Sequence, residues 1–450
     1  MTAAQSVGAH TAGDPYLPRS GNGGYRVEHY DLDLRYRVST NRLDAKAIIT
    51  AVATQELSSF SLDLHGLRAG KVSVDAAKRT RFRQTTGKLI VTPERPITAG
   101  SAFTVLIDYA GSPRPRRSRW GAVGWEELTD GVIVASQPSG APTWFPCNDH
   151  PSDKAAYRIR VSAEQAYTVV ATGELVSRTV ASGRMTWTYE CPEPTATYLA
   201  TVQIGRYLSR EIGDEGTRIE VDYPVSLESR VTSDVRVVPR MLGYFSTIFG
   251  PYPFPSYRMI VTQDELEIPL EAQGAAIFGA NHMDGESGSV RLVAHELAHQ
   301  WFGNSVGLAS WQHIWLNEGF ACYAEWLWSE HDGRDSADVL AHRFHAALLM
   351  QPRDLVLSDP GPDDLFDDRV YKRGALTLHA LRVLLGDAPF FELIRTWTDR
   401  HRFGLVTTQD FQTLAGETTG RDLDAFFRSW LDSKALPPLM HALPAPPEQR

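Results

Sequence analysis

The sequence predicts an α+β multidomain protein in which an antiparallel β-sheet domain precedes a mainly helical domain. Short segments with alternating apolar and polar residues fill the first half of the 450 residues, and longer helical patterns fill the second. One helical segment, VAHELAHQWFGN at 293–304, carries two histidines four positions apart, with a glutamate directly after the first. These observations predict the architecture and place a candidate metal site in the helical part.

The composition narrows the class of protein before any motif is considered. Hydrophobic residues make up 42% of the chain and charged residues 22%, which is typical of folded domains, and the chain is too long for one core. The formal net charge of −9 does not favour a nucleic-acid partner. No apolar stretch approaches the ~20 residues of a membrane span, and no signal-peptide pattern is visible, so we expect a cytoplasmic protein without a membrane partner.

The domain organisation follows the change in hydrophobic pattern along the chain. Residues 1–24 are small, polar and Gly-rich, which predicts a flexible N-terminal segment. The β domain is expected over 25–206, where segments such as YRVEHYDLDLRYRVS and AFTVLIDYAG alternate between Gly, Pro and Asn/Asp signals. A helical domain is expected over 207–436, and a Pro-rich tail over 437–450.

Helical periodicity sets the expected elements of the second domain. A first helix is expected to end at Gly250 and Pro251, and a strand follows it. The later helices are expected at 289–302, 312–329, 336–349, 372–385, 390–398 and 422–431.

The helix expected at 289–302 has the spacing of a metal site. At 3.6 residues per turn, His295 and His299 lie on the same face, so both imidazoles can reach one ion. Glu296 is rotated by about 100° from His295, which directs it toward a metal-bound water rather than the metal. The flanking positions are apolar nearly all round, and burying these polar residues without a partner is costly. The alternative is a core helix with hydrogen-bonded histidines, and a third ligand distinguishes the two.

The segment WQHIWLNEGFACYAEWLW supplies that ligand. Glu318 follows His299 by 19 positions and completes a His, His, Glu set, which suits one Zn²⁺ per chain and leaves a position open for water. Gly319 is expected to let this second helix approach the first closely. Glu325 lies on the same face as Glu318, where it either orients a ligand histidine or is a partly exposed carboxylate. Cys322 is interpreted as a small buried thiol rather than a rival ligand.

HELAHQWFGN followed by NEGFACYAEW resembles the aminopeptidase-N family of zinc metallopeptidases, gluzincins in which a downstream Glu follows the His-Glu-x-x-His helix. The resemblance covers Tyr25 to about Leu436. It implies a saddle- or sandwich-like β domain, a thermolysin-like catalytic domain and zinc-dependent hydrolysis of peptides with a free N-terminus. Family members commonly continue with a large helical C-terminal domain, so the resemblance implies a short form, which we expect to be a monomer.

The resemblance also implies substrate-binding residues. The family segment Gly-Ala-Met-Glu-Asn, whose Glu holds the substrate's α-amino group, matches EIPLEAQGAAIFG. This match puts Glu271 in the amine-binding role and Leu270 in the Met place, as an apolar wall. Ile268 and Pro269 replace Gly-Ala, and Pro269 has no N–H to offer a substrate backbone. Within SQPSGAPTWFPC, Gln137 is the implied second contact to the amine.

VYKRGALTLHAL resembles the family segment whose Tyr hydrogen-bonds the tetrahedral intermediate, which implies that Tyr371 stabilises the oxyanion. Glu296 is the expected general base. Glu265 or Glu267 takes the place of Glu271 if the register of the match differs, and the remaining alternative is that all three acids lie in a solvated loop. The alternative functions are an epoxide hydrolase or endopeptidase of the same family, and a non-catalytic zinc-binding module, which the intact Glu296 argues against.

Overall fold

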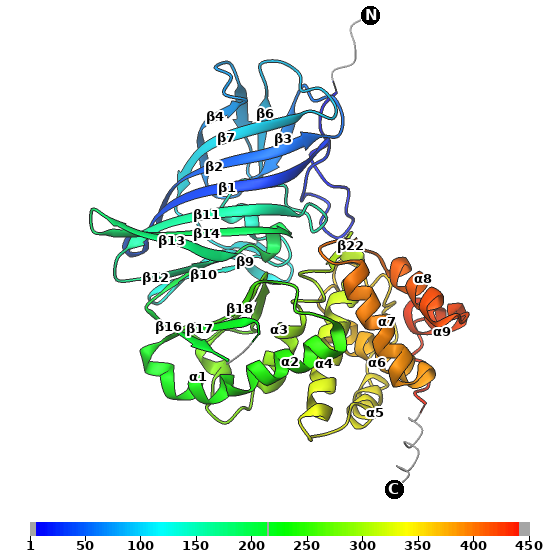
Figure 1. The fold of residues 1–450 in the computed structure, drawn as a ribbon. Helices are drawn as coiled ribbons and strands as arrows, with labels where there is room; N and C mark the ends of the chain where they lie inside the picture. Colours follow the sequence, from blue (N-terminus) through cyan, green and yellow to red (C-terminus); the bar gives the residue numbers. More distant parts are fainter. Residues whose placement is uncertain (1–5, 214–215, 441–450) are drawn as a thin grey trace, which may run out of the picture. The chain divides into compact units, whose positions relative to one another are not determined.

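The computed structural model describes residues 6–213 and 216–440. The chain forms two compact units: a β-rich unit, residues 1–236 with 254–288, and a helical unit, residues 237–253 with 289–450. Figure 1 shows strands throughout the first and helices throughout the second, which confirms the expected fold class. Residues 207–236 belong with the β-rich unit in this division, and the boundary expected between 206 and 207 stays a prediction.

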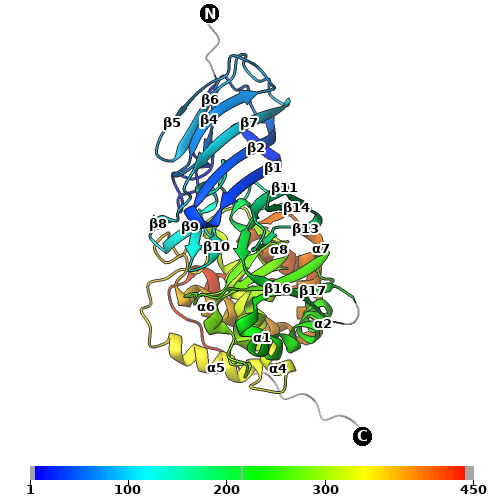
Figure 2. The same ribbon diagram turned by 90° about the vertical axis from the view of Figure 1, so that its left-hand side faces the viewer.

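A seven-stranded sheet is the largest element of the β-rich unit (Figures 1 and 2). Its order is β13 (Glu174–Ala181), β14 (Arg184–Thr195), β11 (Ala155–Glu164), β1 (Tyr25–Arg37), β2 (Arg42–Ala53), β7 (Ala102–Gly111) and β4 (Arg68–Val74). Alternate residues of β1 are buried, as the sequence pattern predicts. Strands β1 and β11 run parallel, which departs from the antiparallel expectation, and the long chain between them permits this pairing.

Two smaller sheets complete the main core of this unit. The first has the order β12 (Thr168–Ala171), β15 (Val202–Gly205), β10 (Gly131–Ala135), β9 (Gly121–Leu128) and β8 (Arg116–Ser118). The second has the order β3 (Phe60–Asp63), β6 (Lys88–Thr92) and β5 (Arg81–Gln84).

A fourth sheet in the β-rich unit mixes parallel and antiparallel pairs. Its order is β16 (Tyr207–Ile212), β17 (Arg218–Pro224), β18 (Ser256–Val261), β20 (Ala275–Phe278) and β19 (Leu270–Ala272). Helix α1 (Glu228–Asp234) contacts β17. The short strand β19 forms one edge of this sheet and pairs with β20.

The helical unit contains most of the helices that the sequence predicts. The helices of this unit are α2 (Val238–Phe249), α3 (Val290–Ala298), α4 (Trp315–His331), α5 (Ala337–Leu348), α6 (Asp368–Leu385), α7 (Asp387–Arg400), α8 (Thr408–Thr419) and α9 (Asp424–Phe427), which a π-helical turn at Arg428–Asp432 follows. Strands β21 (Gly307–Leu308) and β22 (Leu405–Val406) pair in parallel. Among residues 6–213 and 216–440, no helix is both long and apolar enough to cross a membrane.

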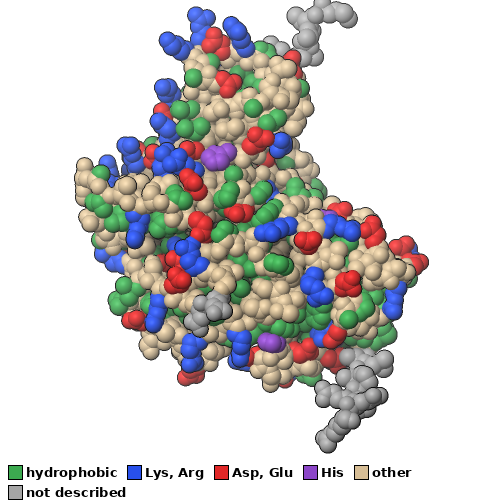
Figure 3. Space-filling view, in the orientation of Figure 1, with side chains coloured by type: hydrophobic (Ala, Val, Ile, Leu, Met, Phe, Trp, Pro, Cys, Tyr) green, Lys and Arg blue, Asp and Glu red, His purple; other side chains and the backbone are tan. Residues whose placement is uncertain are grey.

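Helix α8 was not predicted, because only one narrow side of it is apolar: Phe411, Leu414 and Ala415 are buried. Its start is set by a capping box, in which the Thr407 and Asp410 side chains each accept from the other's backbone N–H. In Figure 3, acidic and basic side chains are interspersed over both units, so neither sign of charge dominates the face shown.

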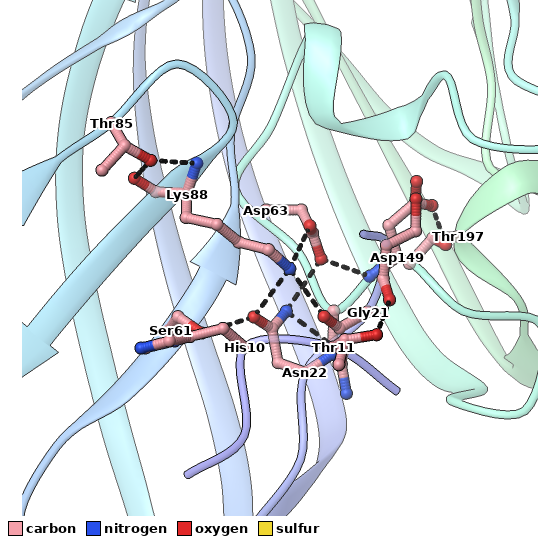
Figure 4. A network of polar contacts seen from close by, with 12 residues as sticks. His10, Thr11, Gly21, Asn22, Ser61, Asp63, Thr85, Lys88, Asp149 and Thr197 are labelled. Atoms are coloured by element: carbon pink, nitrogen blue, oxygen red, sulfur yellow. Dashed lines mark hydrogen bonds and ion pairs between the residues drawn. The ribbon is translucent and has the colours of Figure 1, made fainter. Parts of the chain in front are cut away.

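Residues 6–24 differ from the flexible segment that the sequence predicts, because they pack against the β-rich unit. Asn22 is buried, donates to Asp63 Oδ2 (2.8 Å) and accepts from Ser61 Oγ (2.6 Å), as Figure 4 shows. Lys88 Nζ donates to the Gly21 carbonyl (2.6 Å) and pairs with Asp63 (2.6 Å). These buried contacts hold a loop-like sequence in place. Residues 1–5 and most of the predicted tail, 441–450, lie outside the described residues.

Asp149 belongs to the same polar network and is an unusual buried carboxyl. It is 1% exposed, and its Oδ1 accepts from Thr197 Oγ1 (2.8 Å). Its Oδ2 has no hydrogen-bond partner among the described residues. Burial, and then the charge of Asp63, raise the pKa of Asp149 from 3.8 to about 7. The folded protein therefore binds this proton more tightly than the unfolded chain does.

This raised pKa predicts a pH-dependent stability. Since the folded pKa lies above the unfolded one, the contribution of Asp149 to the free energy of unfolding falls as pH rises from about 4 to about 7. We expect the free energy of unfolding of Asp149→Asn, relative to that of wild type, to increase by about 2–4 kcal/mol when the pH is raised from 5 to 8, because the amide carries no charge. Denaturant unfolding at both pH values measures this. The exposed Asp44→Asn is the control, and equal pH dependence in the two variants would contradict the prediction.

Candidate metal centre and amine-binding residues

Helix α3 presents two buried histidines in a defined protonation state. His295 is 9% exposed and His299 is 1% exposed. His295 Nδ1 hydrogen-bonds Glu325 Oε1 (2.8 Å), and His299 Nδ1 hydrogen-bonds the Phe302 carbonyl (3.0 Å). Because carboxylate and carbonyl oxygens only accept, each Nδ1 carries the proton, and each Nε2 presents its lone pair to a ligand.

Glu318, in the first turn of α4, brings its carboxylate to the same point. Its Oε2 lies 3.4 Å from His295 Nε2 and 3.5 Å from His299 Nε2. Zinc bonds of about 2.0–2.1 Å in a tetrahedral arrangement place neighbouring ligand atoms roughly 3.4 Å apart. The three ligand atoms therefore fit one zinc ion, and this donor set leaves a fourth position for a water or a substrate.

The charges of these residues support one another. Burial by itself would lower the pKa of His295, but in the absence of a metal the hydrogen bonds to Glu318 and Glu325 raise it to about 10, so the Nε2 lone pair becomes available when a metal ion displaces the second proton. Burial would likewise raise the pKa of Glu318, but His299 and His295 hold it at about 2. Glu318 is therefore ionised, which is the form that binds a metal.

Glu296 lies on α3 between the two histidines but does not complete their ligand set. It is 4% exposed, and its Oε2 has no hydrogen-bond partner among the described residues. Burial raises its pKa, against the opposing charges of His295 and His299. A buried carboxylate with an unpartnered oxygen and a raised pKa is suited to taking up a proton.

Glu325 is buried (4% exposed) and orients His295, so it is not the partly exposed carboxylate of the alternative interpretation. Its Oε2 accepts from Arg291 Nη1 (2.9 Å). Burial would raise the pKa of Glu325, but the hydrogen bond and charge of His295, and then the charges of Lys372 and Arg291, lower it. Neither cation was predicted as part of the site, although Arg291 lies one helical turn before His295 and on the same face of the helix. The thiol of Cys322 is fully buried and has a raised pKa, which makes it a poor metal ligand.

Helices α4 and α6 approach each other closely at two glycines. A Cβ at Gly319 would lie 2.8 Å from Gly374 Cα, and a Cβ at Gly374 would lie 2.6 Å from Gly319 Cα. The expectation that Gly319 faces the first histidine helix is wrong, because the helical rotation after Glu318 turns the next residue toward α6. This approach brings α6 close enough for the Tyr371 ring to stack on His295, with centroids 6.0 Å apart.

The β-rich unit holds the expected amine-binding pair. Gln137, which follows β10, donates from Nε2 to Oε1 of Glu271 in β19 (2.6 Å), although 134 residues separate them. Glu265 and Glu267 are exposed and precede β19, so Glu271 is the acid that the structure pairs with Gln137. Leu270 packs on the apolar cluster around Ile277, on the face of β19 opposite Glu271, and its role as a wall for the substrate stays a prediction.

A β-rich unit followed by a helical unit with a His, His, Glu centre defines the class of the gluzincin zinc metallopeptidases. Comparison of the sequence identifies the family. Residues 26–199 match the Peptidase M1 N-terminal domain, and residues 234–430 match the Peptidase family M1 domain. The chain belongs to peptidase family M1, which confirms the resemblance.

Solved and curated relatives agree with this assignment. The structure of an M1 zinc metallopeptidase from Deinococcus radiodurans, a Glu-to-Ala variant bound to a Tyr-Ser-Ala substrate, superposes with a TM-score of 0.89. Its sequence is 32% identical, and the match covers 96% of this chain and 99% of that one. Aminopeptidase M1-A of Oryza sativa subsp. japonica is 27% identical over 68% of this chain and 37% of its own length.

Leucyl aminopeptidase of Saccharolobus solfataricus is 24% identical over 92% of this chain and 54% of its own length. The chain thus spans about half the length, or less, of these two curated relatives.

The contact between α4 and α6 predicts a strong effect of a single methyl group. We expect Gly374→Ala to lower the free energy of unfolding by about 1–3 kcal/mol, because the new Cβ meets backbone atoms that cannot move independently. Thermal and denaturant unfolding measure the change. Gly243→Ala in α2 is the matched control, since, apart from the neighbouring residues of α2, no heavy atom of residues 6–213 and 216–440 lies within 4 Å of the new Cβ and alanine favours a helix. Equal effects of the two changes would contradict the prediction.

The bond between Glu325 and His295 predicts weaker metal binding when the charge is removed. We expect Glu325→Gln to lower zinc affinity about 10–100-fold, because the amide orients the imidazole less well and makes it a weaker ligand. Competition with a chromophoric chelator measures the affinity. Glu330→Gln, at the end of the same helix, is the control because Glu330 pairs with Arg382 instead. Unchanged affinity in Glu325→Gln would show that the carboxylate does not support the metal site.

Proposed function

We propose that the protein is a zinc-dependent aminopeptidase, which hydrolyses the N-terminal residue from peptides with a free N-terminus. The observation that carries this proposal is the His, His, Glu ligand set with the unpartnered carboxylate oxygen of Glu296 on the same helix. The names of the curated relatives, which are aminopeptidases, support it. We also propose that it acts on peptides in the cytoplasm as a monomer, as the sequence analysis expects.

The chemistry divides between the metal and the side chains of the helical unit. Zinc, when held by His295, His299 and Glu318, supplies a Lewis acid that polarises the scissile carbonyl and makes water easier to ionise. Glu296 takes the proton of the attacking water and passes it to the leaving amine. Tyr371 donates its phenol hydrogen to the carbonyl oxygen as that oxygen becomes negative.

The free N-terminus is selected by charge. The carboxylate of Glu271 forms an ion pair with the substrate's α-ammonium group, and Gln137 orients that carboxylate. An N-acetylated peptide has no positive charge to offer, so this contact favours removal of single residues from a free end. We infer a preference for a neutral or apolar first residue from the family match that puts Leu270 in the Met place.

The proposal predicts the behaviour of Glu296→Gln. Initial rates on a panel of aminoacyl anilides should show activity in wild type and a loss of about 10²–10⁴-fold in the variant, because the amide cannot take up a proton. Zinc content, measured in both proteins, should be equal, since Glu296 is not a ligand.

Full activity in Glu296→Gln would exclude it as the general base. No activity in zinc-loaded wild type would overturn the aminopeptidase proposal. Cleavage of an N-acetylated peptide would then indicate an endopeptidase, hydrolysis of an epoxide would indicate an epoxide hydrolase, and neither would indicate a zinc-binding module.

A further inference from the structure

The carboxylate of Glu271 stands on a short strand at the edge of its sheet. Strand β19 has three residues, and β20 is the strand with which it pairs in the described part of the chain. A tight turn at Gln273 and Gly274 joins the two strands, and Gly274 has a φ of 72°, which favours glycine. A three-residue strand can form few backbone hydrogen bonds with a neighbouring strand, so contacts outside the sheet help to define its position. Binding of the substrate amine nevertheless requires a well-placed carboxylate.

The side chain of Gln273 ties this turn to the seven-stranded sheet. Gln273 is 2% exposed, and its backbone N–H donates to the Leu199 carbonyl (3.2 Å). Its Nε2 donates to Thr195 Oγ1 and to the Glu193 carbonyl (3.3 Å), both in the last residues of β14, and lies 3.7 Å from Cys191 Sγ. The turn that ends β19 is therefore anchored to a strand about 80 residues earlier in the chain.

The orientation of this amide is determined by its partners. The Glu193 carbonyl only accepts, so the side-chain nitrogen faces it and Oε1 points away. Oε1 is buried and has no hydrogen-bond partner among the described residues. A cavity of about 30 Å³ that Gln273, Glu193 and Cys191 help to line has room for one water. A buried amide with one unpaired atom costs free energy, so apolar packing alone does not account for a glutamine here.

We propose that Gln273 is a positioning residue for the amine-binding carboxylate. It holds the turn at the end of β19, and the strand in turn sets where the Glu271 carboxylate stands, while Gln137 sets its orientation. Gln273 itself does not contact the substrate, since its side chain is bonded to β14. This inference rests on the proposed role of Glu271, and it assigns the two glutamines separate tasks: one holds the carboxylate and the other holds its strand.

The test compares two buried glutamines of the β-rich unit. Gln203 in β15 is 0% exposed, donates from Nε2 to Thr201 Oγ1 (2.6 Å) and has no partner for Oε1 among the described residues, so it is comparable to Gln273 in burial and in its unpaired oxygen. Gln273→Met and Gln203→Met each remove one buried amide and keep the side-chain length. We expect similar losses of thermal stability in both.

Of the two glutamine variants, only Gln273→Met should raise the KM for an aminoacyl anilide. We expect a rise of roughly tenfold, with kcat within about twofold of wild type. Thr195→Val removes the hydroxyl that accepts from Nε2 and should raise KM in the same direction. It provides the same test if Gln273→Met does not fold. An equal rise of KM in Gln203→Met, or no rise in Gln273→Met and Thr195→Val, overturns the proposal.

Glu271→Gln, measured in the same assay, separates this proposal from the proposed function. If Glu271→Gln raises KM and Gln273→Met does not, the positioning role alone is overturned. If Glu271→Gln leaves KM unchanged, the amine-binding role fails and the positioning role fails with it. In the double variant, Gln273→Met should add less than about twofold to the effect of Glu271→Gln, because no carboxylate remains to be positioned. If the two single changes in KM multiply fully in the double variant, Gln273 does not act through Glu271.

Discussion

The helical unit depends on how it neutralises the charged side chains buried along α3 and α4. His295, His299, Glu296, Glu318 and Glu325 are all buried, and unpaired charges in such surroundings would be costly. The two ligand histidines and Glu318 satisfy one another around a point that fits zinc, and Glu325 joins the network through His295. This pairing fixes the separation of α3 and α4, and the glycine contact then fixes α6 against α4. The position of Tyr371 follows from both constraints.

Polar contacts have a comparable role in the β-rich unit, where short segments lack the apolar area to define their own position. Residues 6–24 are held through Asn22, Asp63 and Lys88, and β19 is held through Gln273. Buried hydrogen bonds are directional and lose much of their value when a partner shifts. They therefore specify the place of a segment more sharply than a small apolar contact would.

Several features were predictable because they depend on spacing within one element. The pairing of His295 with His299 follows from the helical repeat, and the placement of Glu318 and Glu325 on one face follows from the same repeat in α4. Helix α8 was not predicted, because its segment is mostly polar and only a narrow side of it is buried, which leaves a weak apolar periodicity in the sequence. The ordered packing of residues 6–24 was not predicted, because a loop-like composition does not reveal partners such as Asp63, which lies far along the chain.

The sequence by itself determined the fold class and the family, and it supplied the residues of the proposed ligand set, since periodicity and motif spacing are local and can be recognised without knowledge of the packing. Only the tertiary structure decided that Glu271, rather than Glu265 or Glu267, pairs with Gln137, and that Gly319 meets Gly374. The hydrogen bonds from Gln273 to β14 were likewise decided only by the tertiary structure. These contacts join segments that no repeat relates, and their distances result from the packing of whole sheets and helices.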